Sequence, residues 1–258
     1  MHFPRFWARG ASGAFVCWRW SDSNSEDAES QARDAAAQLA RRFQAEGRLV
    51  QRYGYSDRPL REPVLREIRD ASGNTAAVIT RNSYGCQILN TARAMFVDVD
   101  LEESGVPLEA ALARAGYWAK THPGWGWRVY RTAAGLRLLA THAPFDPKDG
   151  LCQSVFEATG ADPLYRRLCS VQECFRARLT PKPWRCGVSN PPARWPFPDD
   201  GAERRYQSWE EEYRSKSYGK VTCQLVNTFG SPDVHPDIAP LVSIHDDMTA
   251  VGRPGKLA

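Results

Sequence analysis

The order of the hydrophobic patterns between residues 94 and 179 is the feature that most constrains the fold of this chain. Some segments alternate apolar and polar residues, as strands do, and others repeat apolar residues at helical spacing. Along the chain they occur in the order strand, helix, strand, strand, helix, strand. The expected elements span residues 94–100, 107–121, 127–132, 136–141, 148–171 and 174–179. The second helix is expected in two pieces, split near Gly160. This order predicts an α+β fold of the ferredoxin-like or RNA-recognition-motif type, an antiparallel sheet with helices on one face.

We expect one composite domain over residues 1–258, because no linker-like segment separates its parts. Residues 1–93 form an amino-terminal α/β part, 94–185 the core, and 186–258 a carboxy-terminal extension of helices and strand. Before the core, strands are expected at 14–20, 64–69, 75–80 and 87–90, a helix at 25–45 and a loop over 53–59. After it, we expect a proline-rich loop over 181–198, helices at 202–217 and 236–249, and a strand at 221–229.

Composition narrows the classes of protein that fit this chain. No run of about 18 apolar residues is present to span a membrane, and the amino terminus lacks the apolar core of a secretory signal. The protein is therefore expected to be cytoplasmic, without a membrane partner. The seven cysteines are then expected to be free thiols. A zinc site using Cys169, Cys174 and Cys186 stays open as an alternative.

Two aspartates stand in the first strand of the expected core, within the segment Met95–Glu102. Side chains alternate across a strand, so Asp98 and Asp100 point to the same face. Two neighbouring carboxylates repel each other, and a bound Mg²⁺ or Mn²⁺ commonly compensates that repulsion. The alternative is a solvated strand end beside an arginine.

Positive charge gathers between residues 160 and 194. Only Asp162 and Glu173 oppose the seven basic residues of this stretch, which are Arg166, Arg167, Arg176, Arg178, Lys182, Arg185 and Arg194. Such a patch suits contact with phosphate groups. In contrast, His245, Asp246 and Asp247 are expected on the solvated face of the last helix.

The aspartate pair and the hairpin that follows resemble motifs of a known family. The hairpin reads Arg131-Thr132-Ala133-Ala134-Gly135-Leu136-Arg137. A strand ending in an acid-x-acid pair, followed by a hairpin with Thr or Ser, small residues and Gly, resembles the first two motifs of archaeo-eukaryotic primases and related primase-polymerases. That family builds its catalytic core on a modified RNA-recognition motif. The resemblance covers about residues 95–185; the whole chain is also similar to a group of bacterial proteins, a likeness that carries no activity.

The resemblance implies a divalent-metal-dependent nucleotidyltransferase whose partners are a nucleoside triphosphate and nucleic acid. It implies that Asp98 and Asp100 hold Mg²⁺ or Mn²⁺ and that Glu173, or in reserve Asp162, is the third acid of the catalytic set. The residues that it implies for contact with the nucleotide or phosphates are Arg131, Thr132, Arg137, Arg176, Arg178 and Lys182.

One departure from the family leaves other functions open. The family has a histidine on the returning strand of the hairpin where this chain has Arg137. Arginine binds phosphate but does not donate a proton by titrating. His142, five residues further along the strand, falls on the opposite face. The alternatives are a catalytically degenerate module that binds single-stranded nucleic acid, and a protein-interaction component of a bacterial multi-protein system.

Overall fold

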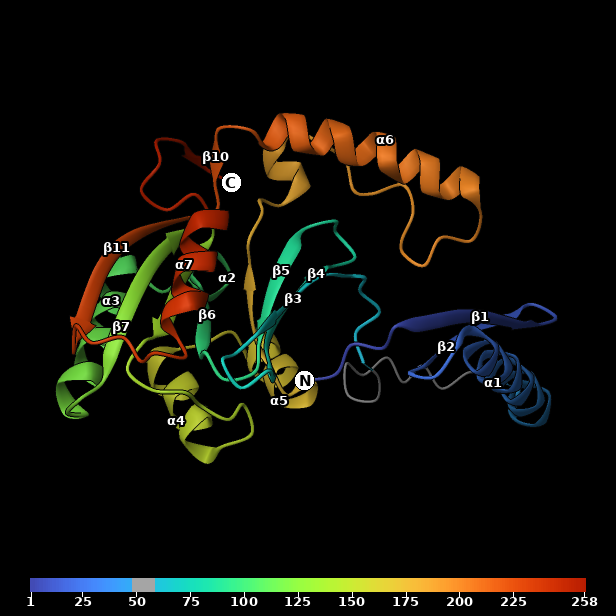
Figure 1. The fold of residues 1–258 in the computed structure, drawn as a ribbon, viewed down its shortest axis with the longest axis horizontal. Coiled ribbons are helices and arrows are strands. Elements are labelled where there is room, and N and C mark those ends of the chain that lie inside the picture. Colours follow the sequence, from blue (N-terminus) through green and yellow to red (C-terminus); the bar gives the residue numbers. More distant parts are fainter. Residues whose placement is uncertain (48–58) are drawn as a thin grey trace.

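Two four-stranded antiparallel sheets form the centre of the computed structural model, which describes residues 1–47 and 59–258 (Figure 1). The first sheet has the strand order β11-β7-β8-β6, with β6 at Phe96–Asp100, β7 at Gly126–Thr132, β8 at Gly135–Ala140 and β11 at Cys223–Gly230. The second has the order β3-β4-β5-β9, with β3 at Val64–Arg69, β4 at Thr75–Arg81, β5 at Gln87–Thr91 and β9 at Phe175–Arg178. The protein is therefore a mixed α+β structure.

Helices cover both faces of the first sheet. The helices of this region are α2 at Leu101–Ser104, α3 at Leu108–Thr121, α4 at Gly150–Thr159, α5 at Pro163–Gln172 and α7 at Ala239–Met248. Cross-strand register places Asp98 opposite Arg137, which in turn lies opposite Tyr130, so these three side chains share one face of the sheet. His245 of α7 packs against Tyr130 on that face. The face that carries the central arginine is thus covered by α7.

The amino-terminal residues form a separate layer at one end of the molecule, drawn in blue in Figure 1. Strands β1 (Phe6–Ser12) and β2 (Phe15–Ser21) form a hairpin against α1 (Ser25–Glu46). Gly10 permits this close approach, because a Cβ there would lie 2.1 Å from the backbone carbon of Ala32. The loop expected over 53–59 lies, except for Pro59, outside the described residues.

Helix α6 (Asp200–Ser217) and the 3₁₀ turn at Pro183–Cys186 lie across the top of the molecule in Figure 1. The chain continues through β10 (Lys220–Val221), β11 and α7, and its last strand, β12 (Lys256–Leu257), pairs in parallel with β10. None of the helices in the described ranges is long and apolar enough to cross a membrane. The seven cysteines are all unpaired thiols.

Most of the elements expected from the sequence are present, but their grouping into sheets differs from the expected one. The core elements from β6 to β9 follow the expected order, and the helix at 148–171 is split into α4 and α5 at Gly160. However, β9 hydrogen-bonds to β5 of the second sheet, and β11 forms the edge beside β7. The ferredoxin-like sheet is therefore not confirmed. Strand β1 was not expected.

A tyrosine hydroxyl joins the two sheets where β6 and β9 approach each other. The Tyr165 hydroxyl lies 2.9 Å from the Phe96 carbonyl of β6 and 3.1 Å from the Arg176 carbonyl of β9, and it accepts from the Arg176 N–H at 3.3 Å. Nearby, the backbone N–H of Asp162 donates to the Asp98 carbonyl at 2.9 Å. Helix α5 thus satisfies backbone groups that a continuous sheet would have paired.

The Tyr165→Phe variant tests this bridge. Removing the hydroxyl leaves buried backbone groups of both strands without a partner, which costs about 1–3 kcal/mol of the free energy of unfolding. Urea denaturation followed by circular dichroism measures the loss. The matched control is Tyr117→Phe, at a side chain that is 70% exposed, which should stay within about 0.5 kcal/mol of the parent protein. Equal stabilities of the two variants would contradict the bridging role.

Candidate functional site

A cavity of about 470 Å³ lies where the edges of the two four-stranded sheets meet. Its walls come from β4, β5, β6, β8 and β9, from α5 and α6, from the turn after β4, and from residues 60–63, 182 and 193–195. Among the described residues that line it, Glu62 and Asp98 are acidic. The basic ones are Arg61, Arg81, Arg137, Arg176, Arg178, Lys182 and Arg194. This excess of positive charge is suited to an anionic ligand.

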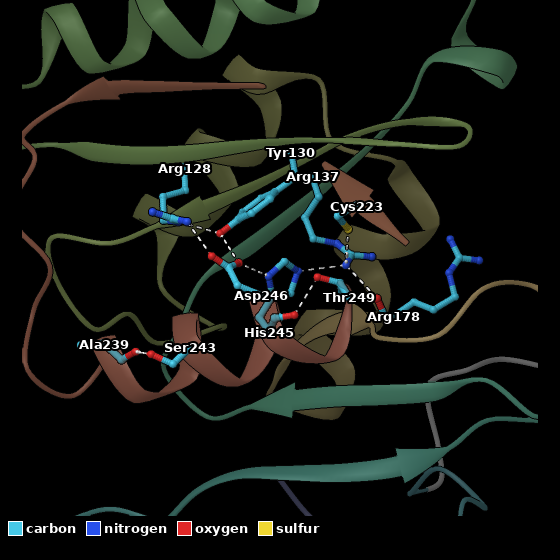
Figure 2. Close-up of polar contacts among 10 residues, drawn as sticks. All are labelled: Arg128, Tyr130, Arg137, Arg178, Cys223, Ala239, Ser243, His245, Asp246 and Thr249. Carbon is cyan, nitrogen blue, oxygen red and sulfur yellow. Dashed lines mark hydrogen bonds and ion pairs between the residues drawn. The ribbon is translucent and has the colours of Figure 1, made fainter. Parts of the chain in front are cut away.

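Arg137 of β8 occupies the inner wall of the cavity. Its side chain is almost completely buried, with 2% of the residue exposed. Nη1 donates to the Arg178 carbonyl at 2.8 Å and lies 3.3 Å from the Cys223 thiol and 3.2 Å from His245 Nε2 (Figure 2). Nε lies 4.0 Å from the Asp98 carboxylate, beyond hydrogen-bonding distance. The guanidinium is therefore held on one side and left without a close carboxylate on the other.

Arg176 of β9 is buried beside Glu62. Its Nη2 donates to both carboxylate oxygens of Glu62, at 2.9 and 3.1 Å, and Thr80 donates its hydroxyl to the same carboxylate at 2.5 Å. This buried ion pair fixes residues 60–63 against the second sheet. The two residues are 114 positions apart, and both line the cavity, so the pair joins distant segments of its wall.

Arg178 and Lys182 complete the basic cluster. Burial lowers the pKa of the Arg178 guanidinium; the charge of Arg137 lowers it too, while Asp98 raises it. For Lys182, burial and the charges of Arg178 and Arg185 lower the pKa, and Asp100 and Asp98 only partly oppose them. Burial is the first cause for both groups, so the charged forms of both side chains are poorly solvated. An anion bound in the cavity would stabilise these charged forms.

Three guanidinium nitrogens in this cluster are buried without a hydrogen bond to any described residue. They are Arg137 Nε, Arg176 Nη1 and Arg178 Nε. A buried donor without an acceptor costs about 1–3 kcal/mol. Phosphate and carboxylate oxygens are the acceptors that match guanidinium donors in charge and geometry. Such donors suit an anionic ligand.

Of the four predicted acidic residues, only Asp98 lines the cavity, with its side chain 40% exposed. Asp100 lies next along the strand and caps α2, where its Oδ1 accepts from the Glu103 N–H at 2.8 Å. Asp162 caps α5 by accepting from the Tyr165 N–H at 2.6 Å. Glu173 ends α5 at the surface and pairs with Lys148. Neither candidate for the third acid lines the cavity.

The predicted phosphate contacts also divide into two groups. Arg137, Arg176, Arg178 and Lys182 line the cavity together. Arg131 and Thr132 instead close the hairpin between β7 and β8: Arg131 Nη1 donates to the Gly135 carbonyl at 2.9 Å, and the Gly135 N–H donates to the Thr132 hydroxyl at 3.0 Å. Within residues 1–47 and 59–258, no group of three or more His, Cys, Asp or Glu side chains is arranged to hold a metal.

A buried polar network lies behind Arg137, and it shows that the solvated face expected for His245 was wrong. His245 is fully buried, Asp246 is half-buried and Asp247 alone is exposed; His245 Nδ1 lies 2.9 Å from Asp246 Oδ1. Asp246 also accepts from the Tyr130 hydroxyl at 2.8 Å and from Arg128 at 2.5 Å (Figure 2). The signal that was missed is the helical spacing of Ile238, Leu241 and His245, which places the imidazole on the apolar face of α7.

No known protein family, no curated protein and no solved structure matches this chain. Its function is therefore argued from the cavity and its charged groups.

The burial of His245 predicts a specific pH dependence of stability. Burial lowers its pKa in the folded protein to about 4, whereas an unfolded histidine titrates near 6.5. Between these values the unfolded state binds more protons, so the free energy of unfolding falls by roughly 3 kcal/mol as pH drops from 6.5 to 4. Urea unfolding at a series of pH values measures this. His245→Gln should lack this component, whereas His2→Gln, at an exposed site, should keep it; identical profiles for both variants would contradict the assignment.

Proposed function

We propose that this cavity binds the phosphate groups of a nucleotide, and that the protein is a primase-like nucleotidyltransferase or a nucleotide-binding relative that acts on nucleic acid. The observation that carries the proposal is the set of three guanidinium groups, Arg137, Arg176 and Arg178, each with one buried, unpartnered nitrogen, beside Lys182. Several donors that converge on one volume suit a ligand with several phosphate oxygens.

The size and the walls of the cavity support a nucleotide rather than a single phosphate. A volume of about 470 Å³ falls within the range of about 300–1,000 Å³ common for small-molecule sites. Apolar and aromatic side chains also line the cavity, and a nucleobase can pack against such surfaces. They include Leu60, Tyr84, Ile88 and Trp195.

The spatial order of four strands supports the primase-like part of the proposal. Strand β9 lies beside β6 through the Tyr165 bridge, β6 pairs with β8, and β8 pairs with β7. This is the strand order of a ferredoxin-like or RNA-recognition-motif sheet, here with one junction made by a side chain instead of a backbone ladder.

A divalent cation fits this site only together with a ligand. Mg²⁺ often takes one or two carboxylates and completes its shell with phosphate oxygens and water. Asp98, which lines the cavity, and the oxygen of Asp100 that does not cap α2 would supply these carboxylates, and both raise the pKa of Lys182. A cation held there would neutralise phosphate charge and favour ionisation of an attacking hydroxyl. Asp98 would orient it toward the phosphates held by Arg137 and Arg178.

A second candidate function is binding of single-stranded nucleic acid without chemistry. Two observations favour it. Histidine is absent from the described residues that line the cavity, and His245 lies behind Arg137 with no exposed surface. On this alternative, affinity falls steeply with salt and does not depend on Mg²⁺.

Substitution of Arg178 tests the phosphate site. Arg178→Ala removes a charge-assisted donor, which is worth about 1.5–3 kcal/mol, and should weaken binding of ATP and inorganic tripolyphosphate about 10- to 100-fold. Isothermal titration calorimetry measures both ligands. Arg41→Ala, on the exposed face of α1, is the matched control and should bind like the parent protein. Equal affinities for the two variants would remove the basis of the proposal.

Substitution of Asp98 separates the two candidate functions. If the protein is a nucleotidyltransferase, Mg²⁺ or Mn²⁺ should tighten ATP binding by the parent protein about tenfold or more. Asp98→Asn should lose this metal effect and retain metal-free binding. Direct Mn²⁺ binding followed by electron paramagnetic resonance, with and without ATP, reports on the same site. If metal has no effect on the parent protein, the metal-free alternative is favoured.

A further inference from the structure

We infer that His245, oriented by Asp246, is a positioning residue that holds the Arg137 guanidinium in place for a phosphate ligand. This inference rests on the proposed function of the cavity and adds to it a role for a helix that does not line it. The contacts that carry it run in one connected series from Arg128 and Tyr130 through Asp246 and His245 to Arg137 (Figure 2).

Arg137 is buried without a carboxylate within hydrogen-bonding distance. A buried guanidinium usually needs a carboxylate partner, yet the nearest one, Asp98, lies 4.0 Å from Nε. Nη1 instead shares its two N–H groups among three acceptors, namely the Arg178 carbonyl, the Cys223 sulfur and His245 Nε2. The carbonyl belongs to β9, whereas the imidazole comes from α7, so the side chain is fixed from two elements.

The imidazole must present a lone pair to Arg137, and Asp246 ensures that it does. Arg137 donates at Nη1 and cannot accept, so His245 Nε2 has to be the acceptor. The proton of the neutral ring then sits on Nδ1, 2.9 Å from Asp246 Oδ1. Asp246 is itself fixed by the Tyr130 hydroxyl and by Arg128. Each member of the series therefore determines the orientation of the next.

The contact with His245 matters for the cavity because it affects where the other nitrogens of Arg137 lie. With Nη1 held from behind, Nε remains buried without a hydrogen bond to any residue in the described ranges, near Asp98 and the ligand volume. Without the acceptor at His245, Nη1 would lose one of its three contacts. The guanidinium could then rotate toward Asp98, and its preorganisation for an anion would decrease.

Binding of inorganic tripolyphosphate, measured by isothermal titration calorimetry at pH 7.5, tests this role. His245→Leu removes the acceptor and should weaken binding roughly tenfold, the size of one such hydrogen bond. His245→Gln keeps an acceptor oxygen and should bind within about threefold of the parent protein. Thermal unfolding monitored by circular dichroism establishes that each variant is folded; if His245→Leu is not, His245→Gln and the double variants decide.

A double-variant comparison distinguishes positioning from a general structural effect. In an Arg137→Ala background, adding His245→Leu or His245→Gln should change affinity no further, because the histidine acts through Arg137. A further loss in that background would overturn the inference, as would parent-like binding by His245→Leu. Failure of the proposed function gives a different result: the parent protein and Arg178→Ala would then show equal, negligible binding of tripolyphosphate.

Discussion

The cavity exists because two sheet edges approach each other without forming a continuous ladder. Strand β9 is already paired with β5, so its remaining edge faces β6 across a junction filled by the Tyr165 hydroxyl and the start of α5. Asp98 and Arg176 reach the cavity from the two sides of this junction. Continuous backbone pairing would bring the strands to about 4.8 Å and would leave no side chain between them.

The charged groups around the junction fall into two classes with different roles. Arg176 has a carboxylate partner in Glu62, and Arg81 has one in Glu210, so their positions are fixed by ion pairs within the protein. Arg137 and Arg178 lack such a close partner among the residues described, and they face the same volume. Arg176 and Arg81 are thus fixed by close carboxylates, whereas Arg137, 4.0 Å from Asp98, and Arg178 carry the charge that would attract an anion.

Local sequence patterns predicted the elements better than their arrangement. The split between α4 and α5 follows from Gly160, whose positive φ ends one helix just before the Asp162 cap and Pro163 begin the next. Likewise, the alternation of Arg176 and Arg178 in β9 placed both on one face, as observed at the cavity. Which strand the four-residue β9 pairs with, however, depends on tertiary contacts such as the ion pair of Glu62 with Arg176. No local pattern encodes a contact across 114 positions.

Because the Tyr165 junction separates the two sheets, a ligand bound beside it would also stabilise the contact between them. A ligand that contacts Arg137 of the first sheet and Arg178 of the second connects two layers that share few backbone hydrogen bonds. Such a molecule acts as a non-covalent crosslink, and a ligand present at 100 times its dissociation constant adds about 2.7 kcal/mol to the stability of the folded state. If the cavity binds phosphate groups as proposed, the melting temperature of this protein would report the ligand, and a library of phosphorylated compounds could be searched without any assay of catalysis.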